Sequence, residues 1–512
     1  MITWPLEPSI THSDAAVIDV GSNSVRLVLY RLEGRAVWSV FNEKVQAGLG
    51  RDLTRTGALS PEGVTSAITA LKRFRALIDA SRPRFIYPAA TAAVREASDG
   101  EAFRRRVFHE TGFDLRVLSG AEEARYAALG VMAGDPTATG LAGDLGGASL
   151  ELVRLGPNGP EPGVTLPLGP FALDPLSRQD PARVRAAVDR HAGPIAGVFK
   201  TDTLHAVGGA WRNLALLQMR ISGYPLEIVH QYEIVRRDAL DAARFISQQS
   251  RGSLDRIPGI SKRRLEDMPH AAAVLEGLIE HLDIQTVSIS AFGVREGLLW
   301  QAMSTEIQRL DPLIAGCATL GGRGPVAEEL GLALQAWLGG ALERLEPVFP
   351  GREPTLIDAA CRLAELGAQL HPDHRADLVF DQVLRAPIAG MNHAERAFLA
   401  CAIFSRHTAS PATPRPELVS RLLTPERQKR ARVLGAALRL ACDLSGRSPE
   451  LLQKCRFQIK PNVVLLEADE TWAPILLGDQ TAKRAGTLAA LLDRDAKLRT
   501  SGVKKWQFVG AA

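Results

Sequence analysis

The 512-residue sequence has few cysteines and no long apolar run. All five cysteines follow residue 316 and none forms a Cys-x-x-Cys pair, which excludes a disulfide framework and a cysteine-based zinc site. No apolar stretch approaches the roughly 20 residues that span a bilayer. The first residues lack the basic and apolar regions of a secretory signal. We therefore expect a cytoplasmic protein with reduced thiols and no membrane span.

A large excess of one charge is also lacking, since 61 Lys and Arg oppose 57 Asp and Glu. With 46% hydrophobic and 23% charged residues, the composition excludes a disordered chain, collagen and a coiled-coil rod. Basic clusters at 104–106, 236–237 and 262–264 are either solvated helix faces or a surface that attracts a polyanion. Trp4, Trp38 and Trp506 form no cluster for base stacking, so nucleic acid is not implied.

Strand and helix patterns alternate over the first 300 residues, and helical patterns follow from about residue 306. The strand patterns lie at 14–19, 25–30, 85–87, 115–118, 139–143, 150–154, 164–168, 203–207 and 286–290. Two rounds each open with a strand, an Asp-x-Gly turn and a second strand, which indicates a duplicated α/β domain. Beyond residue 306 only 455–467 resembles strand, and 251–264 is predicted to be a mobile loop.

The two Asp-x-Gly turns, 19–24 and 144–149, are the first candidates for chemistry. Each would present backbone N–H groups and hydroxyl donors to an anion, and a carboxylate at the strand end can hold Mg²⁺ or water beside a phosphate. A single such turn is often only a tight turn that requires glycine. Two of them about 125 residues apart predict a two-sided phosphate clamp.

Five segments, in matching order and spacing, resemble the exopolyphosphatase/guanosine pentaphosphatase (Ppx/GppA) family of the sugar-kinase/actin-like superfamily. They are 16–27, 90–96, 118–124, 144–151 and 290–297. The resemblance implies an α/β fold in which two tandem ribonuclease-H-like (actin-like ATPase) domains precede a mainly α-helical C-terminal domain. The expected boundaries are 1–135, 136–305 and 306–512, with the active cleft between the first two domains.

The resemblance also implies the site residues. Glu123 is the implied catalytic base, with Glu122 as its neighbour, although an acidic first helical turn explains both residues equally well without the family. The implied phosphate-binding residues are Gly21, Ser22, Asn23, Ser24, Arg95, Gly146, Gly147, Ser149, Gly208 and Gly209. For the last two, a purely structural role remains open. The implied ligands of a Mg²⁺ ion are Asp144 and Glu151, with Asp19 as a weaker candidate.

Two residues depart from the family's second loop, which usually reads Gly-Gly-Gly-Ser-Thr-Glu. Ala148 requires an ordinary negative φ, and Leu150 removes a hydroxyl that could touch phosphate or metal-bound water. These departures affect the expected metal ligands more than phosphate binding, which the loop should still provide.

The C-terminal region resembles a degenerate metal-hydrolase-like helical domain. Four histidines fall near its ligand positions, namely His371, His374, His393 and His407, but no contiguous His-Asp pair accompanies them. We interpret them as surface or core histidines. The domain is expected to form a homodimer and to lengthen a basic substrate channel.

The function that the resemblance implies is exopolyphosphatase activity on inorganic polyphosphate, with release of orthophosphate. Guanosine pentaphosphate 5′-phosphohydrolase stays open, because both substrates end in a phosphoanhydride. A polyphosphate:ADP phosphotransferase and a polyphosphate binder without turnover are the remaining alternatives.

Overall fold

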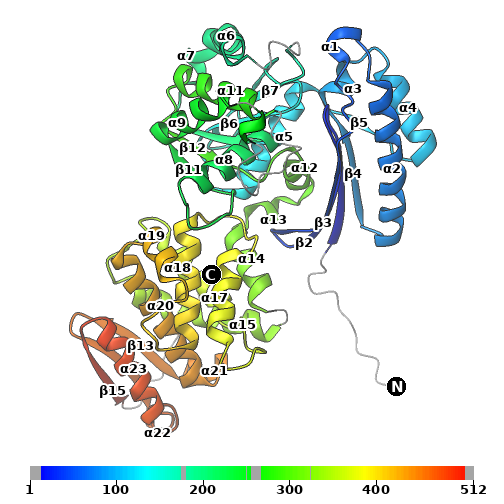
Figure 1. The fold of residues 1–512 in the computed structure, drawn as a ribbon. Coiled ribbons are helices and arrows are strands. Elements are labelled where there is room, and N and C mark those ends of the chain that lie inside the picture. The colour runs from blue at the N-terminus through cyan, green and yellow to red at the C-terminus, as the bar shows by residue number, and fades with distance from the viewer. Residues whose placement is uncertain (1–12, 174–179, 250, 255–266, 323–324, 502–512) are drawn as a thin grey trace, which may run out of the picture. The chain divides into compact units, whose positions relative to one another are not determined.

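The computed structural model describes residues 13–173, 180–249, 251–254, 267–322 and 325–501 (Figure 1). The chain divides into two compact units, Met1–Pro312 and Leu313–Ala512. None of the helices in the described ranges combines the length and the hydrophobicity of a membrane-spanning segment. Most of the predicted loop 251–264, with the basic cluster 262–264, lies outside the described residues; its first four residues form the short helix α10 (Arg251–Leu254).

The first sheet lies near the beginning of the first unit. In spatial order its strands are β3 (Ala36–Val45), β2 (Val25–Glu33), β1 (Ser13–Val20), β4 (Phe85–Ala90) and β5 (Arg116–Val117). The first three are antiparallel, and β4 and β5 continue parallel to β1. Helices α2 (Pro61–Ser81) and α4 (Gly100–Thr111) cover one face, where Phe74 and Val107 join Ile18 and Leu27 in the core (Figure 1).

The second sheet repeats this plan. Its order is β11 (Tyr232–Val235), β12 (Thr286–Ile289), β10 (Thr203–Val207), β6 (Gly140–Leu145), β7 (Leu150–Gly156) and β8 (Gly159–Pro160), with β9 (Val164–Leu166) also paired to β7. Strand β6 corresponds to β1, because it pairs antiparallel with the strand that follows it, β7, as β1 pairs with β2. On its other side β6 is parallel to β10, and β10 is parallel to β12, as β1, β4 and β5 are in the first sheet. Because the same strand order recurs, the predicted duplication is confirmed. The longer helices of this half are α6 (Pro181–Ala192), α8 (Gly209–Ile221), α9 (Arg236–Ser247) and α11 (Met268–His281).

Two helices, α5 (Gly120–Gly134) and α12 (Val294–Ala302), belong to the layer between the sheets. Tyr126 of α5 packs with β1 and β2 of the first sheet, in a cluster that also includes Leu298 of α12. Ala124 and Val131 of α5 pack against the second sheet. Helix α5 is therefore held by both halves of the first unit, which fixes the position of the acidic residues in its first turn.

One buried hydrogen bond joins β2 to α12. The Tyr30 hydroxyl donates to Glu296 Oε1 at 2.5 Å, and Glu296 Oε2 accepts from the Gly293 backbone N–H at 2.9 Å. We expect Tyr30→Phe to lower the free energy of unfolding by about 1–3 kcal/mol, because a buried carboxylate loses a donor. Chemical denaturation measures this, with Tyr87→Phe on β4 of the same sheet as the control. Equal stability of the two variants would contradict the expected role of the bond.

The second unit is mainly helical and ends in a small sheet. Its longer helices are α15 (Pro325–Leu342), α16 (Glu353–Arg362), α17 (Arg375–Arg385), α18 (His393–His407), α20 (Pro425–Ser445) and α23 (Asp479–Leu491). The sheet consists of β13 (Cys455–Lys460), β14 (Val463–Asp469) and β15 (Asp495–Ser501). The expectation of strand at 455–467 alone is therefore wrong by one strand, β15. Exposed and partly buried positions alternate along β15, but none of its residues is fully buried and only Ala496 and Leu498 are apolar, so its strand pattern is weak.

The remaining α-helices of the described residues are α1 (Leu53–Thr56), α3 (Ala92–Glu96), α7 (Ala196–Phe199), α13 (Thr305–Arg309), α14 (Pro312–Gly321), α19 (Pro416–Leu422), α21 (Pro449–Leu452) and α22 (Ala473–Leu476).

Candidate active site

The two Asp-x-Gly turns have the same local structure. The Gly21 N–H donates to Ser24 O at 3.0 Å, and the Gly146 N–H donates to Ser149 O at 2.9 Å. The first turn joins β1 to β2, and the second joins the corresponding strands β6 and β7. The duplication of the fold therefore includes its turns, which supply a matched pair of loops.

The two turns also lie against one another. A Cβ atom on Gly147 would be 3.0 Å from Ser22 Cβ and 3.5 Å from the Asn23 backbone nitrogen. Glycine at 147 therefore permits the close approach of the loops. Ala148 is absent from the described residues with positive φ, as the sequence predicted. Leu150 is fully buried in the core of the second sheet.

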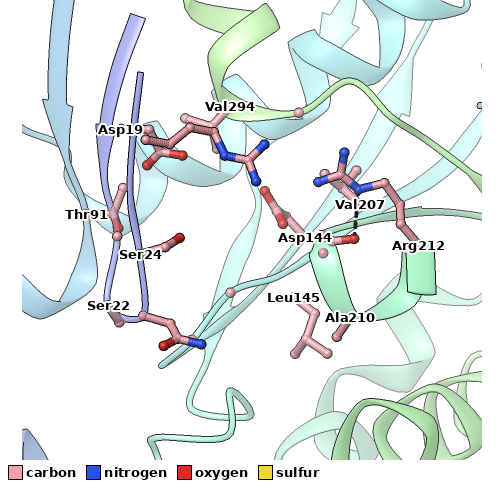
Figure 2. A pocket seen from close by; sticks show the side chains of 18 of the residues that line it. Asp19, Ser22, Ser24, Thr91, Asp144, Leu145, Val207, Ala210, Arg212 and Val294 are labelled. Atoms are coloured by element: carbon pink, nitrogen blue, oxygen red, sulfur yellow. Dashed lines mark hydrogen bonds between the residues drawn. The ribbon is translucent and has the colours of Figure 1, made fainter. Parts of the chain in front are cut away.

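A cavity of about 660 Å³ opens between the walls that carry the two turns. Figure 2 shows Asp19, Ser22, Ser24 and Thr91 on one wall and Asp144, Leu145, Val207, Ala210 and Arg212 on the other. The predicted residues that line it are Asp19, Gly21, Ser22, Asn23, Ser24, Glu123, Asp144, Gly146, Gly147, Ser149, Gly208 and Gly209. The structure thus brings together almost the whole predicted set; Arg95 and Glu151 are not lining residues.

The glycine pair at the end of β10 has two different roles in the backbone. Gly208 has φ +117°, and a Cβ there would lie 2.6 Å from Leu145 O, so this position requires glycine. Gly209 begins α8 and has open space where a side chain would be. The first N–H groups of α8 are thus close to the cavity, where a helix N-terminus favours an anion.

Glu122 and Glu123 point to different surroundings. Ser119 caps α5, and the Glu122 side chain returns to the Ser119 N–H at 2.9 Å, completing a capping box. Glu122 also pairs with Arg116 at the surface. Glu123 is 8% exposed and lines the cavity. Because successive helical residues point about 100° apart, only Glu123 faces the two loops.

Arg95 contacts this carboxylate directly. One of its guanidinium nitrogens, Nη1, donates to Glu123 Oε2 at 3.1 Å and to Leu118 O at 2.7 Å. Burial raises the pKa of Glu123 to about 7; Arg95 opposes the shift, while Asp144 and Asp19 add to it. Arg95 therefore orients Glu123 in this structure, and its predicted contact with phosphate stays a prediction.

Glu151 lies behind the cavity wall. It is 1% exposed, and its Oε1 atom has no hydrogen-bond partner among the described residues. Burial raises the pKa of its carboxyl group well above the usual value, and the neighbouring carboxylates of Glu123 and Asp144 raise it further. A protonated Glu151 reduces the negative charge that Glu123 experiences.

Two carboxylates line the cavity at corresponding strand ends. Burial raises the pKa of Asp144 to about 6, against the opposing charge of Arg212, and Asp19 lies 3.6 Å from the Arg295 guanidinium. Carboxylate pairs of this kind suit Mg²⁺, which keeps several waters and binds one or two carboxylates plus substrate phosphates. In the part of the chain that the structure describes, no group of three or more His, Cys, Asp or Glu side chains could hold a metal alone. The residues fit a metal that arrives with a phosphate substrate.

Sequence reasoning missed several cationic lining residues, namely Arg26, Lys44, Arg212 and Arg295. A signal existed for two of them, since Arg26 and Arg295 lie within the segments that carry the family resemblance. Arg212 follows the glycine pair by one helical turn, and its Nε donates to Gly208 O at 3.2 Å. Lys44 lies on a strand that the sequence did not predict.

The basic cluster 104–106 does not line the cavity, and two of its arginines pair with acidic residues of the same helix. Arg104 and Arg106 form ion pairs on α4 with Glu101 and Glu110, at 2.9 and 2.6 Å. This favours the interpretation of that cluster as a solvated helix face.

The four C-terminal histidines are spread over the surface and the core. Those at 371 and 374 are exposed, with ring centroids 5.7 Å apart. His393 is buried at the start of α18, and the ring of His407, at its end, lies 2.9 Å from Leu366 O.

Comparison with known proteins gives consistent matches. The model of the Ppx/GppA phosphatase family matches residues 28–306, more than half of the chain, and that of the exopolyphosphatase C-terminal region matches residues 334–498. Exopolyphosphatase 1 of Mycobacterium leprae is 27% identical over 307 residues, which cover 57% of this chain and 89% of that protein. Retrograde regulation protein 2 of Saccharomyces cerevisiae is 24% identical over 442 residues, covering 78% of this chain and 73% of that protein.

Solved structures share the fold of the first unit. The Ppx/GppA family member of Aquifex aeolicus is 25% identical with a TM-score of 0.50, covering 56% of this chain and 97% of that one. An exopolyphosphatase from Cytophaga hutchinsonii, 22% identical, covers the same shares with a TM-score of 0.52. With the duplicated domain, the paired loops and the family match over more than half of its length, this chain belongs to the Ppx/GppA phosphatase family.

Proposed function

We propose that this protein is an exopolyphosphatase, which hydrolyses the terminal phosphoanhydride of linear inorganic polyphosphate and releases orthophosphate. The main support is the pair of matched loops that meet at Ser22 and Gly147 in one cavity with Glu123. Each loop offers N–H groups and hydroxyls to a phosphoryl group, so adjacent phosphates of a chain can be bound from two sides. Family membership and the relatives named exopolyphosphatase 1 support the same substrate.

In this proposal Glu123 accepts the proton of the attacking water. A carboxylate with a pKa of about 7 is well matched to proton transfer near neutral pH. Arg95 engages Oε2, which leaves Oε1 to receive the water's proton. The loops of Ser22 and Ser149 hold the phosphoryl group under attack and the departing chain in line with that water.

Asp144 and Asp19 are the cavity residues that would hold Mg²⁺. When bound, the cation neutralises charge on the phosphoryl oxygens during transfer. Glu151 is better placed to influence the pKa of Glu123 than to contact a cation in the cavity, because it is not a lining residue.

A phosphate-release assay tests the proposal. With Mg²⁺ present, we expect orthophosphate release from tripolyphosphate and from chains of several hundred phosphates, with higher kcat/KM on the long chains. Release that occurs only with ADP present, with ATP as product, would instead indicate a phosphotransferase. No turnover of any chain would contradict the proposal.

Guanosine pentaphosphate is the second candidate substrate, and one observation favours it. The cavity is also lined by the apolar side chains of Leu216 on α8, Val229, and Ala271 on α11, which make no polar contact with phosphate but suit a base. Comparing kcat/KM on the nucleotide and on polyphosphate separates the two candidates. A strong preference for the nucleotide would reverse our order.

A further inference from the structure

The exposed side of β3 lines the same cavity as the two phosphate loops. Asn42, Lys44 and Gln46 occupy alternate positions, are all exposed and all line the cavity. Alternation along a strand places such residues on one face of the sheet. Glu43, between them, points to the opposite face, where it accepts a hydrogen bond from Arg73 of α2 at 2.7 Å. The side of β3 toward the cavity is therefore polar and cationic.

Strand pairing extends this face to the catalytic centre. In the register of the first sheet, Lys44 is opposite Arg26, and Arg26 is opposite Asp19. Directly opposite side chains have Cβ atoms about 5 Å apart, and like charges in such a pair repel. An anion bound by both side chains would remove this repulsion. The row of side chains formed by Asp19, Arg26 and Lys44 thus favours a ligand with several negative charges.

The row also has a direction. It begins at Asp19 on the central strand β1 and ends at Lys44 on β3, which is the edge strand of its sheet. Two strand spacings separate these positions, about 10 Å. A chain of phosphates whose end is bound between the loops spans this distance within a few phosphates, so Lys44 can bind phosphates behind the terminal one.

We propose that Lys44, flanked by Asn42 and Gln46, binds the polyphosphate chain several phosphates behind its reacting end and leads it across the first sheet to the free edge at β3. This inference rests on the proposed function and adds the path of the chain. The ammonium group of lysine is a mobile point charge, which suits successive phosphates that shift past it after each cleavage. The loops, in contrast, position the terminal group.

The test compares substrates of different length on the variants Lys44→Ala and Lys44→Glu. We expect Lys44→Glu to lower kcat/KM for chains of several hundred phosphates by about tenfold or more, and to lower it clearly less for tripolyphosphate and guanosine pentaphosphate. Loss of one phosphate contact should also lower the slope of log(kcat/KM) against log[salt] by about 1 for the long chain. Lys44→Arg should keep both the kcat/KM for the long chain and its salt dependence close to the wild-type values.

Lys72→Ala is the matched control, because Lys72 lies on α2, on the other side of the same sheet, and pairs with Glu110 at 2.6 Å. It should leave all substrates unaffected. Equal losses on short and long substrates for Lys44→Glu, or no loss on either, would overturn the inference. Calorimetric Kd values for long polyphosphate and tripolyphosphate provide the same comparison without turnover. Failure of the proposed function would be recognised separately, as absence of polyphosphate hydrolysis by the wild-type protein.

Discussion

Replacing Glu123 with glutamine is expected to lower the rate of polyphosphate hydrolysis by at least about 10²-fold, the usual contribution of a general base. Glutamine keeps the size of the side chain and can still accept a hydrogen bond from Arg95, but it cannot take the proton of the attacking water. Binding of polyphosphate should stay the same or tighten, because a carboxylate near the phosphates is removed. Steady-state kinetics and a separate Kd measurement distinguish the two effects.

Glu122→Gln is the internal control for this experiment. Glutamine at the third position of the helix still completes the capping box with Ser119, so α5 keeps its start. The lost pair with Arg116 is at the surface and contributes little. If Glu122→Gln were the inactive variant, the assignment of the base would be wrong by one residue; if neither variant lost activity, the base would be another residue.

Replacing Arg95 with a neutral residue is the second change for which we expect a large effect, and the effect should appear in the pH dependence of kcat/KM. The Arg95 guanidinium lowers the pKa of Glu123, which burial raises to about 7. In Arg95→Gln that opposition is lost, so the pKa of Glu123 rises further. Because the base acts in its ionised form, the rise of kcat/KM with pH should shift to higher pH, with a loss of about tenfold or more at neutral pH.

Arg95→Lys separates charge from geometry. An ammonium group keeps the positive charge, so the rise of kcat/KM with pH should occur nearer to the pH at which it occurs in the wild type. Lysine has a single nitrogen and cannot keep the planar arrangement in which Nη1 contacts Glu123 Oε2 and Leu118 O while Nη2 contacts Glu96 Oε1, so the maximum rate should still fall. A wild-type profile for both variants would show that Arg95 does not act on Glu123.

Sequence reasoning succeeded where a local pattern carries the structure. The Asp-x-Gly turns at 19–24 and 144–149 are at the predicted places, between the predicted strands, because glycine and a short polar run specify such a turn locally. The duplicated α/β fold follows from the same repeated pattern. The three-domain boundaries and the catalytic roles stay predictions.

The strands that sequence reasoning missed share one physical property. Strands β3, β8, β11 and β15 all lie at sheet edges. An edge strand has fewer buried neighbours, so its sequence need not show the apolar alternation by which strands are recognised. Lys44 was missed for this reason, although its strand lines the candidate site.

The sequence by itself determined the paired turns, the repeated domain and the residues available for phosphate chemistry, because these depend on local backbone preferences and on spacing along the chain. Only the tertiary structure decided that Glu151 is buried outside the cavity lining, that Arg95 contacts Glu123, and that Lys44 lies in a row with Arg26 and Asp19. These relations depend on burial and on contacts between residues distant in sequence. Burial raises the pKa of Glu123, and strand pairing places Arg26 and Lys44 side by side. Neither property can be read from the residues that adjoin these positions along the chain.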